Sequence, residues 1–136
     1  MIKSTLLALL ALSLASCGGD SGDDTRDYQA ALAQASAKQT EAISLAPASP
    51  CNAVQQCANL MLWQPVNHCT ALSYHPYSLV SPTADAASAA AAEEHLLAAH
   101  AVSLAPPPDT ACAASIVAPP QLACVSNTCQ AVAPSN

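Results

Sequence analysis

Residues 81–108 read SPTADAASAAAAEEHLLAAHAVSLAPPP, and this stretch decides the fold class because it carries the strongest helix signal in the chain. Its first residues supply a cap, a first-turn proline and an acidic side chain near the positive end of a helix. The alanine-rich run that follows has high helix propensity, and three prolines end it. We therefore predict one long helix from Thr83. One side of it is marked by Leu97, Ala101 and Leu104, with Ala90 and Glu93 behind them.

Cysteine-bearing segments flank this helix on both sides. Zinc is one interpretation of such cysteines, but only Cys124 and Cys129 come near the spacing that structural zinc sites favour. The flanking segments hold six cysteines, and an even number in a chain that starts with an export signal, described below, instead predicts three disulfides. The order of segments predicts a small α+β domain over residues 51–132, with the long helix packed on a short disulfide-tied sheet or hairpin. The six cysteines are Cys51, Cys57, Cys69, Cys112, Cys124 and Cys129.

The sequence CVSNTC at 124–129 predicts a hairpin. Ser126-Asn127 fits a two-residue turn, because Asn tolerates the left-handed conformation that such turns need. Cys124 would then lie opposite Cys129, within disulfide range. The alternative is that both strands are bonded outward, to Cys51, Cys57 or Cys112.

The hydrophobic core is expected to be modest. The chain has no Phe, and alanine carries much of its apolar fraction while burying little area. Small domains of this kind usually need covalent cross-links. The larger candidates for the core are Leu60, Leu62, Trp63, Leu72, Tyr74, Tyr77, Leu79, Val80, Leu96, Leu97, Leu104, Ile116, Val117, Leu122 and Val125.

The N-terminus has the layout of a secretory signal peptide. A lysine at position 3 precedes an apolar run from Thr5 to Ala15, which is shorter than the ~20 residues that span a bilayer. Leu14-Ala15-Ser16-Cys17 resembles the bacterial lipobox. That resemblance implies cleavage before Cys17 and acylation of this cysteine, for example with palmitate. The alternative is an ordinary signal peptide with a chance cysteine. Two or more acyl chains hold a protein stably on a membrane.

The lipobox resemblance also implies a location. An Asp directly after the lipidated cysteine favours the inner membrane in enteric bacteria, and Gly18 stands there instead. The expectation is a bacterial envelope protein, facing the periplasm or the cell surface, with the outer membrane favoured. Residues 1–16 would be the signal peptide and residues 17–26 a flexible tether. Residues 27–50 would form a stalk that is either helical or partly disordered.

The scarcity of basic residues argues against nucleic acids as partners. No Lys or Arg occurs after Lys38, and phosphate binding needs those cations. We therefore expect no nucleic-acid binding, and membrane contact through Cys17 alone.

No catalytic, metal or cofactor set is evident. His95 and His100 are five residues apart, whereas zinc helices place two histidines four apart. Glu93 and Glu94 are neighbours on one helix and do not face each other. No Gly-x-Ser-x-Gly motif is present. We predict that the protein is not an enzyme.

The mature part resembles uncharacterised cysteine-rich envelope lipoproteins of bacteria over residues 51–130. The resemblance rests on the first three cysteines, Tyr74 and Tyr77, the helix from Thr83, Cys112, and the closing residues Pro120 to Cys129. It implies location and architecture only.

Three functions are consistent with these features. We favour a non-catalytic module that contacts an envelope protein partner. The aromatic cluster of Trp63, His68, Tyr74, His75, Pro76 and Tyr77 is predicted to belong mainly to the core, with Tyr74 to Tyr77 its most exposed part. A second hypothesis is an inhibitor or binding domain for an envelope protease, presenting the loop 70–82. A third is a small metal-binding or hydrolytic protein that uses His68, His75, His95 or His100.

Overall fold

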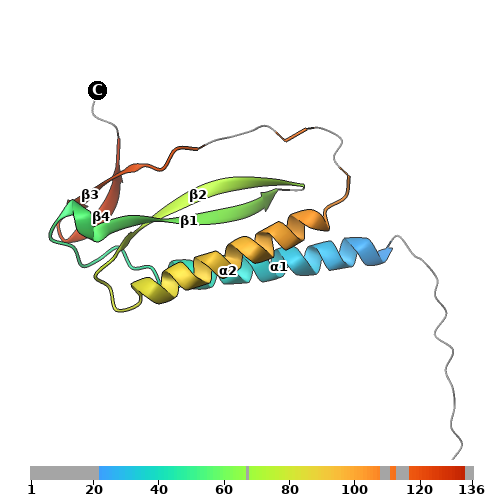
Figure 1. The fold of residues 1–136 in the computed structure, drawn as a ribbon, viewed down its shortest axis with the longest axis horizontal. Helices are drawn as coiled ribbons and strands as arrows, with labels where there is room; N and C mark the ends of the chain where they lie inside the picture. The colour runs from blue at the N-terminus through green and yellow to red at the C-terminus, as the bar shows by residue number, and fades with distance from the viewer. Residues whose placement is uncertain (1–21, 67, 108–110, 113–116, 134–136) are drawn as a thin grey trace, which may run out of the picture.

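The computed structural model describes residues 22–66, 68–107, 111–112 and 117–133. Over these residues the chain forms two long helices and two antiparallel hairpins, which confirms the predicted α+β class (Figure 1). A short 3-10 turn, η1, precedes the first hairpin. The elements are α1 (Gly22–Ser44), η1 (Val54–Gln56), β1 (Cys57–Val66), β2 (Cys69–Ser78), α2 (Ala84–Ser103), β3 (Gln121–Val125) and β4 (Thr128–Val132).

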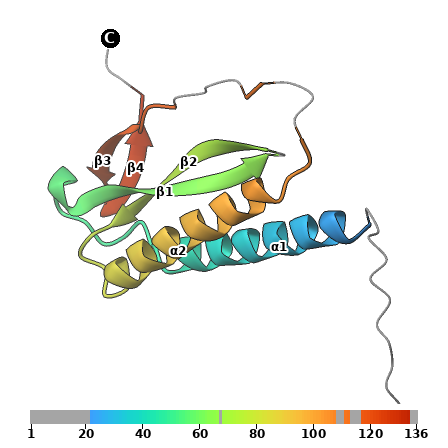
Figure 2. The same cartoon turned by 45° about the vertical axis from the view of Figure 1, so that its right-hand side comes forward.

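The helix α1 occupies the segment that was expected to be a stalk. The helical alternative holds, but α1 begins at Gly22, so residues 22–26 of the predicted tether belong to it. It runs beside α2 in the opposite direction, and both views show this (Figures 1 and 2). Tyr28 of α1 is buried. This helix is therefore packed into the domain, which begins before residue 51.

Alanine forms most of the contact between the two helices and the first hairpin. Small side chains let two helix backbones approach closely, so that many short contacts replace a few large ones. Leu60, Leu62 and Tyr77 are the large apolar side chains buried in this layer. The buried alanines are Ala31, Ala35, Ala42 and Ala46 on one side and Ala84, Ala87, Ala90, Ala91, Ala98 and Ala101 on the other.

Several residues predicted for the core lie on the surface instead. Leu96 is 70% exposed, and Leu79, Val80, Val117 and Val125 are also exposed. The prediction ranked residues by the area they would bury, whereas the tight helix packing leaves little room for large side chains. Ile116 lies outside the described residues.

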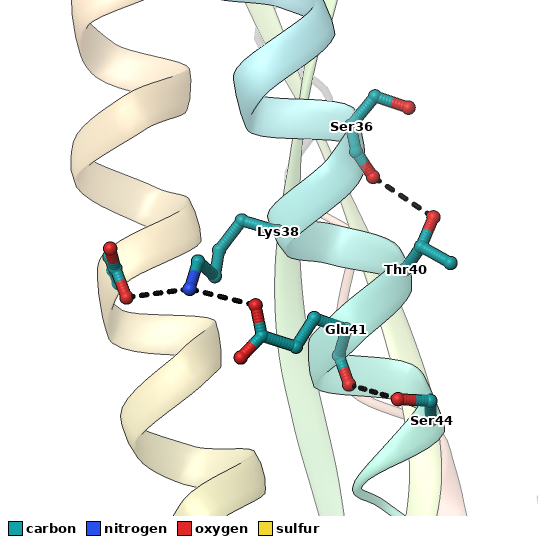
Figure 3. A network of polar contacts seen from close by, with 6 residues as sticks. Ser36, Lys38, Thr40, Glu41 and Ser44 are labelled. Carbon is teal, nitrogen blue, oxygen red and sulfur yellow. Dashed lines mark hydrogen bonds and ion pairs between the residues drawn. The ribbon is translucent and has the colours of Figure 1, made fainter.

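A lysine links the two helices at their surface. The Lys38 ammonium lies 2.8 Å from Glu41 on its own helix and 2.9 Å from Glu93 on α2 (Figure 3). These two carboxylates raise the pKa of Lys38. Exposed pairs of this kind contribute little stability.

The first hairpin pairs β1 with β2 in a continuous antiparallel register from Cys57 opposite Ser78 to Val66 opposite Cys69. Leu60 and Leu62 alternate with exposed Met61, as expected for a strand with one buried face. Pro76 does not break β2, because it pairs with Asn59 within the ladder.

A short connecting segment joins the two hairpins. Residues 46–51 lie between β2 and β4 and bond to both. The Pro47 carbonyl accepts from the Ser78 N–H at 2.9 Å, and the Ala48 carbonyl accepts from the Cys129 N–H at 2.7 Å. The Cys51 N–H donates to the Asn127 carbonyl at 3.2 Å. Backbone groups that the hairpins leave unpaired are satisfied in this way.

Three disulfides are formed, as predicted, and they pair Cys51 with Cys124, Cys57 with Cys129, and Cys69 with Cys112. The predicted turn is also present, with positive φ at Ser126 and Asn127, and Cys124 lies opposite Cys129 in the ladder. Of the two alternatives for these cysteines, the outward one is confirmed, with bonds to Cys51 and Cys57. Opposed residues point to the same face of a hairpin, and here that face meets Cys51 and Cys57, so both bonds run outward.

Candidate interaction surface

Two disulfides and the connecting segment fix one end of the molecule, which we call the stapled end: residues 46–58, 76–83 and 121–133. Its sulfur atoms are gathered closely, since those of Cys51, Cys57 and Cys129 lie within 4.8 Å of one another. Figure 2 shows β3 and β4 beside the start of β1 and the end of β2. This end holds covalent cross-links between segments that are far apart in the sequence.

The stapled end presents exposed apolar side chains on a fixed backbone. Leu79 is 47% exposed and Val80 50% exposed, in the loop between β2 and α2. The Leu79 N–H donates to the Gln56 carbonyl at 2.8 Å, and the Val80 N–H donates to the Ser78 hydroxyl oxygen at 3.3 Å. Val54, in η1 beside Gln56, is exposed as well. Exposed apolar residues on a constrained loop are typical of protein contact surfaces.

Buried hydrogen bonds hold this loop in place. Ser78 is buried, and its hydroxyl donates to the Pro50 carbonyl. The Ser81 hydroxyl lies 2.9 Å from the Thr83 hydroxyl and accepts from the Thr83 N–H at 3.3 Å. The loop therefore loses little conformational freedom when a partner covers it.

The stapled end is also free of formal charge. Residues 46–83 and 117–133 contain no Asp, Glu, Lys or Arg. The charged side chains of residues 22–107 lie on α1 and α2. Covering an uncharged surface avoids the cost of removing ions from water, and the centres of protein interfaces are depleted in charged residues.

Three of the described residues between α2 and β3 contact the first hairpin. Cys112 is bonded to Cys69 at the tip. The Tyr74 hydroxyl donates to the Val117 carbonyl at 3.0 Å, and the Asn59 amide donates to the Pro120 carbonyl at 2.9 Å. The Tyr74 side chain thus holds the segment before β3 against the first hairpin, whereas Tyr77 is buried in the core.

A buried carboxylate, which was not predicted from the sequence, lies where α2 meets β1. Glu94 is fully buried, and its Oε2 accepts from the Trp63 backbone N–H at 3.1 Å. Burial raises the pKa of Glu94, and the Trp63 N–H and the neighbouring His95 partly offset this. The preceding residue, Glu93, is exposed and pairs with Lys38.

The burial of Glu94 follows the inward face of α2, which the sequence does not mark, because alanines occupy all sides of this helix. Six of the seven buried positions of α2 recur at intervals of three and four: Ala84, Ala87, Ala91, Glu94, Ala98 and Ala101. That is the pattern of one helix face. The prediction marked one side of the helix by its leucines. A glutamate is rarely buried inside a protein, so Glu94 was not predicted to lie there.

Trp63 and His95 form a stacked pair beside Glu94. Their ring centroids are 3.9 Å apart and their planes are inclined by 19°. They line a cleft of about 290 Å³ between β1 and α2, together with Asn59, Met61 and Ser88 among others. The indole Nε1 is buried without a hydrogen-bond partner, and so is Glu94 Oε1.

The four histidines serve separate local roles. His75 Nε2 lies 3.0 Å from the Ala46 carbonyl, His95 stacks on Trp63, and His100 is exposed near the end of α2. His68 lies close to the sulfurs of Cys69 and Cys112, which are bonded to each other and offer no thiolate. These positions do not assemble one common site among the residues that the structure describes.

Comparison with protein-family models, with curated proteins and with solved structures finds no match for the chain. No helix within the described ranges has both the length and the apolar character needed to cross a bilayer. Cys17, the predicted lipidation site, lies outside the described residues.

Proposed function

We propose that the chain is a lipid-anchored protein of the bacterial cell envelope that contacts another protein through its stapled end and carries out no catalysis. The observation that carries this proposal is that the start of α1 and the stapled end lie at opposite ends of the molecule. The first turn of α1 lies at one end of the long axis, and the stapled end lies at the other (Figures 1 and 2).

The dimensions of α1 support this arrangement. Its 23 residues rise by about 1.5 Å each, so the helix spans about 34 Å. Four residues separate Cys17 from Gly22. A lipid at Cys17 would hold the first turn of α1 close to the bilayer, and the stapled end would face away from it. The uncharged surface there has no electrostatic attraction to anionic lipid headgroups.

The anchor predicts a specific mass. Protein taken from the native membrane fraction should begin at Cys17 and carry acyl chains, and it should take up six alkylating groups only after reduction. Cys17→Ser should appear in the soluble fraction or keep its signal peptide. Intact-mass spectrometry of both proteins checks this. A wild-type chain without lipid, or thiols that react before reduction, would contradict the proposal.

The contact surface predicts position-dependent cross-linking. A photo-reactive residue placed at Leu79, Val80 or Val54 should give the same discrete product in the native host. The matched control is Leu96, which is more exposed but lies on α2. Immunoblots of irradiated cells make the comparison. No product from the three positions, or the same product from Leu96, would oppose a contact through the stapled end.

A second candidate function is inhibition of an envelope protease. The hydrogen bonds from Ser78 and Ser81 favour it, because they hold exposed Leu79 and Val80 in a fixed loop as inhibitors hold a segment that resists cleavage. If the cross-linked product is a protease, equimolar inhibition by the purified chain distinguishes an inhibitor from a substrate. Cleavage within residues 78–83 without inhibition removes this candidate.

A further inference from the structure

The contact between α2 and β1 contains a carboxyl group whose surroundings suit its neutral form. Glu94 is fully buried, and it receives one hydrogen bond, from the backbone N–H at the edge of β1. Its second oxygen has no partner, and the nearby indole N–H of Trp63 is also unpartnered. Burying a carboxylate with so few partners is costly, whereas a neutral carboxyl group is tolerated.

Among the residues that the structure describes, Glu94 forms no ion pair. On α1, Lys38 is engaged with Glu41 and Glu93. The strand β1 contributes no titratable group, since Cys57 is in a disulfide. On β2, His75 is directed to the Ala46 carbonyl, and the remaining groups are Tyr74 and Tyr77. His95, next to Glu94 on α2, is stacked on Trp63. The charged groups near the start of α1, Asp24 and Asp27, lie by the last turn of α2.

We propose that the proton on Glu94 controls the closure of α2 on β1. With the proton bound, the hydrogen bond from the Trp63 backbone N–H to Glu94 and the stacking of Trp63 on His95 hold α2 against β1 along one wall of the cleft. Loss of the proton leaves a charge that only water can satisfy, so α2 moves away from β1 and the carboxylate becomes hydrated. The stack then opens, and the cleft lined by Asn59, Met61 and Ser88 widens.

The direction of the pH dependence follows from the raised pKa of Glu94. In the open or unfolded chain this carboxyl group ionises at its ordinary pKa, whereas in the closed state it keeps its proton to higher pH. Closure is therefore fully stable below the ordinary pKa of a glutamate. It weakens as pH rises from that value through the raised pKa of the closed state.

Trp63 allows this movement to be measured directly, because it is the single tryptophan of the chain. The measurement uses the full chain with its three disulfides. As pH rises through the transition, the emission maximum of Trp63 should shift to longer wavelength, and acrylamide should quench the emission more strongly. The midpoint should lie above the ordinary range for glutamate. Far-UV circular dichroism should stay constant, because the helices move without melting.

Three variants make the test decisive. Glu94→Gln should abolish the transition and keep the closed emission at all pH values. Glu93→Gln, which changes the exposed neighbour, should retain the transition. His95→Phe should also retain it, because an aromatic ring still stacks on Trp63 and Glu94 is unchanged. The proposal is overturned if wild-type emission does not titrate, if Glu94→Gln titrates like wild type, if His95→Phe abolishes the transition, or if circular dichroism changes with the emission.

Discussion

Removing both disulfides of the stapled end is expected to cost about 7 kcal/mol of unfolding free energy, which is enough to unfold a typical domain. The bonds Cys51–Cys124 and Cys57–Cys129 span separations of 73 and 72 residues. By loop entropy, the first of them to form contributes about 4 kcal/mol. The second then closes a circuit of only roughly a dozen residues and adds about 3 kcal/mol.

These magnitudes predict that the losses are not additive. Replacing one cysteine pair by serine should lower the free energy of unfolding by about 3 kcal/mol, whichever pair is chosen, and the second replacement should cost more than the first. Urea unfolding of the two single-bond variants and the double variant measures this. Equal losses for the first and second replacements would contradict the shared circuit, and a total below about 1 kcal/mol would show that the backbone bonds of residues 46–51 hold this end without the sulfurs.

Ala98→Leu is expected to destabilise the protein by about 1–3 kcal/mol, because it forces a larger side chain into a closely packed helix contact. Ala98 is 0% exposed in the face of α2 that also carries Glu94 and Ala101. The matched control is Ala99→Leu, one position along on the exposed side. It adds the same atoms and the same small change in helix propensity, and we expect it to stay within about 0.5 kcal/mol of wild type.

Thermal and urea unfolding of both variants give the comparison. A similar effect of the two substitutions would mean that α2 does not pack through its alanines. A stabilised Ala98→Leu variant would mean that the contact has space for a leucine, and it would restore the sequence-based expectation of a core built from larger residues.

Local signals in the sequence were sufficient for the elements that depend on local chemistry. The helix from Ala84 to Ser103 was predicted because Pro82, Thr83 and the prolines from 106 mark its ends. The turn at Ser126-Asn127 was predicted from the tolerance of asparagine for positive φ, and the structure has that conformation. Each of these features is determined by residues a few positions apart.

Features that depend on distant segments were not predicted. The pairing of Cys124 depends on where Cys51 lies, and that is set by residues 46–51 entering between the two hairpins. The inner face of α2 depends on its contact with α1, so a leucine such as Leu96 is left outside while Glu94 is enclosed. Ranking residues by hydrophobicity fails when two helices meet through alanine, because the spacing of small residues decides the contact.

The order of the cysteines along the chain has a consequence for maturation. Only Cys69 and Cys112 are neighbours among the six, counted in chain order from Cys51; the other two bonds each skip over later cysteines to reach partners near the C-terminus. An oxidant that joins thiols in the order in which they emerge after export would bond Cys51 to Cys57 before Cys124 and Cys129 come within its reach. The native bonds must then arise by exchange, in which a late thiolate attacks an early, wrong disulfide. In the folded structure the sulfurs of Cys51, Cys57 and Cys129 lie within 4.8 Å of one another, so an exchange among them needs little movement of the backbone once this end has formed. Yield of the mature protein should accordingly follow disulfide-isomerase capacity rather than oxidising power.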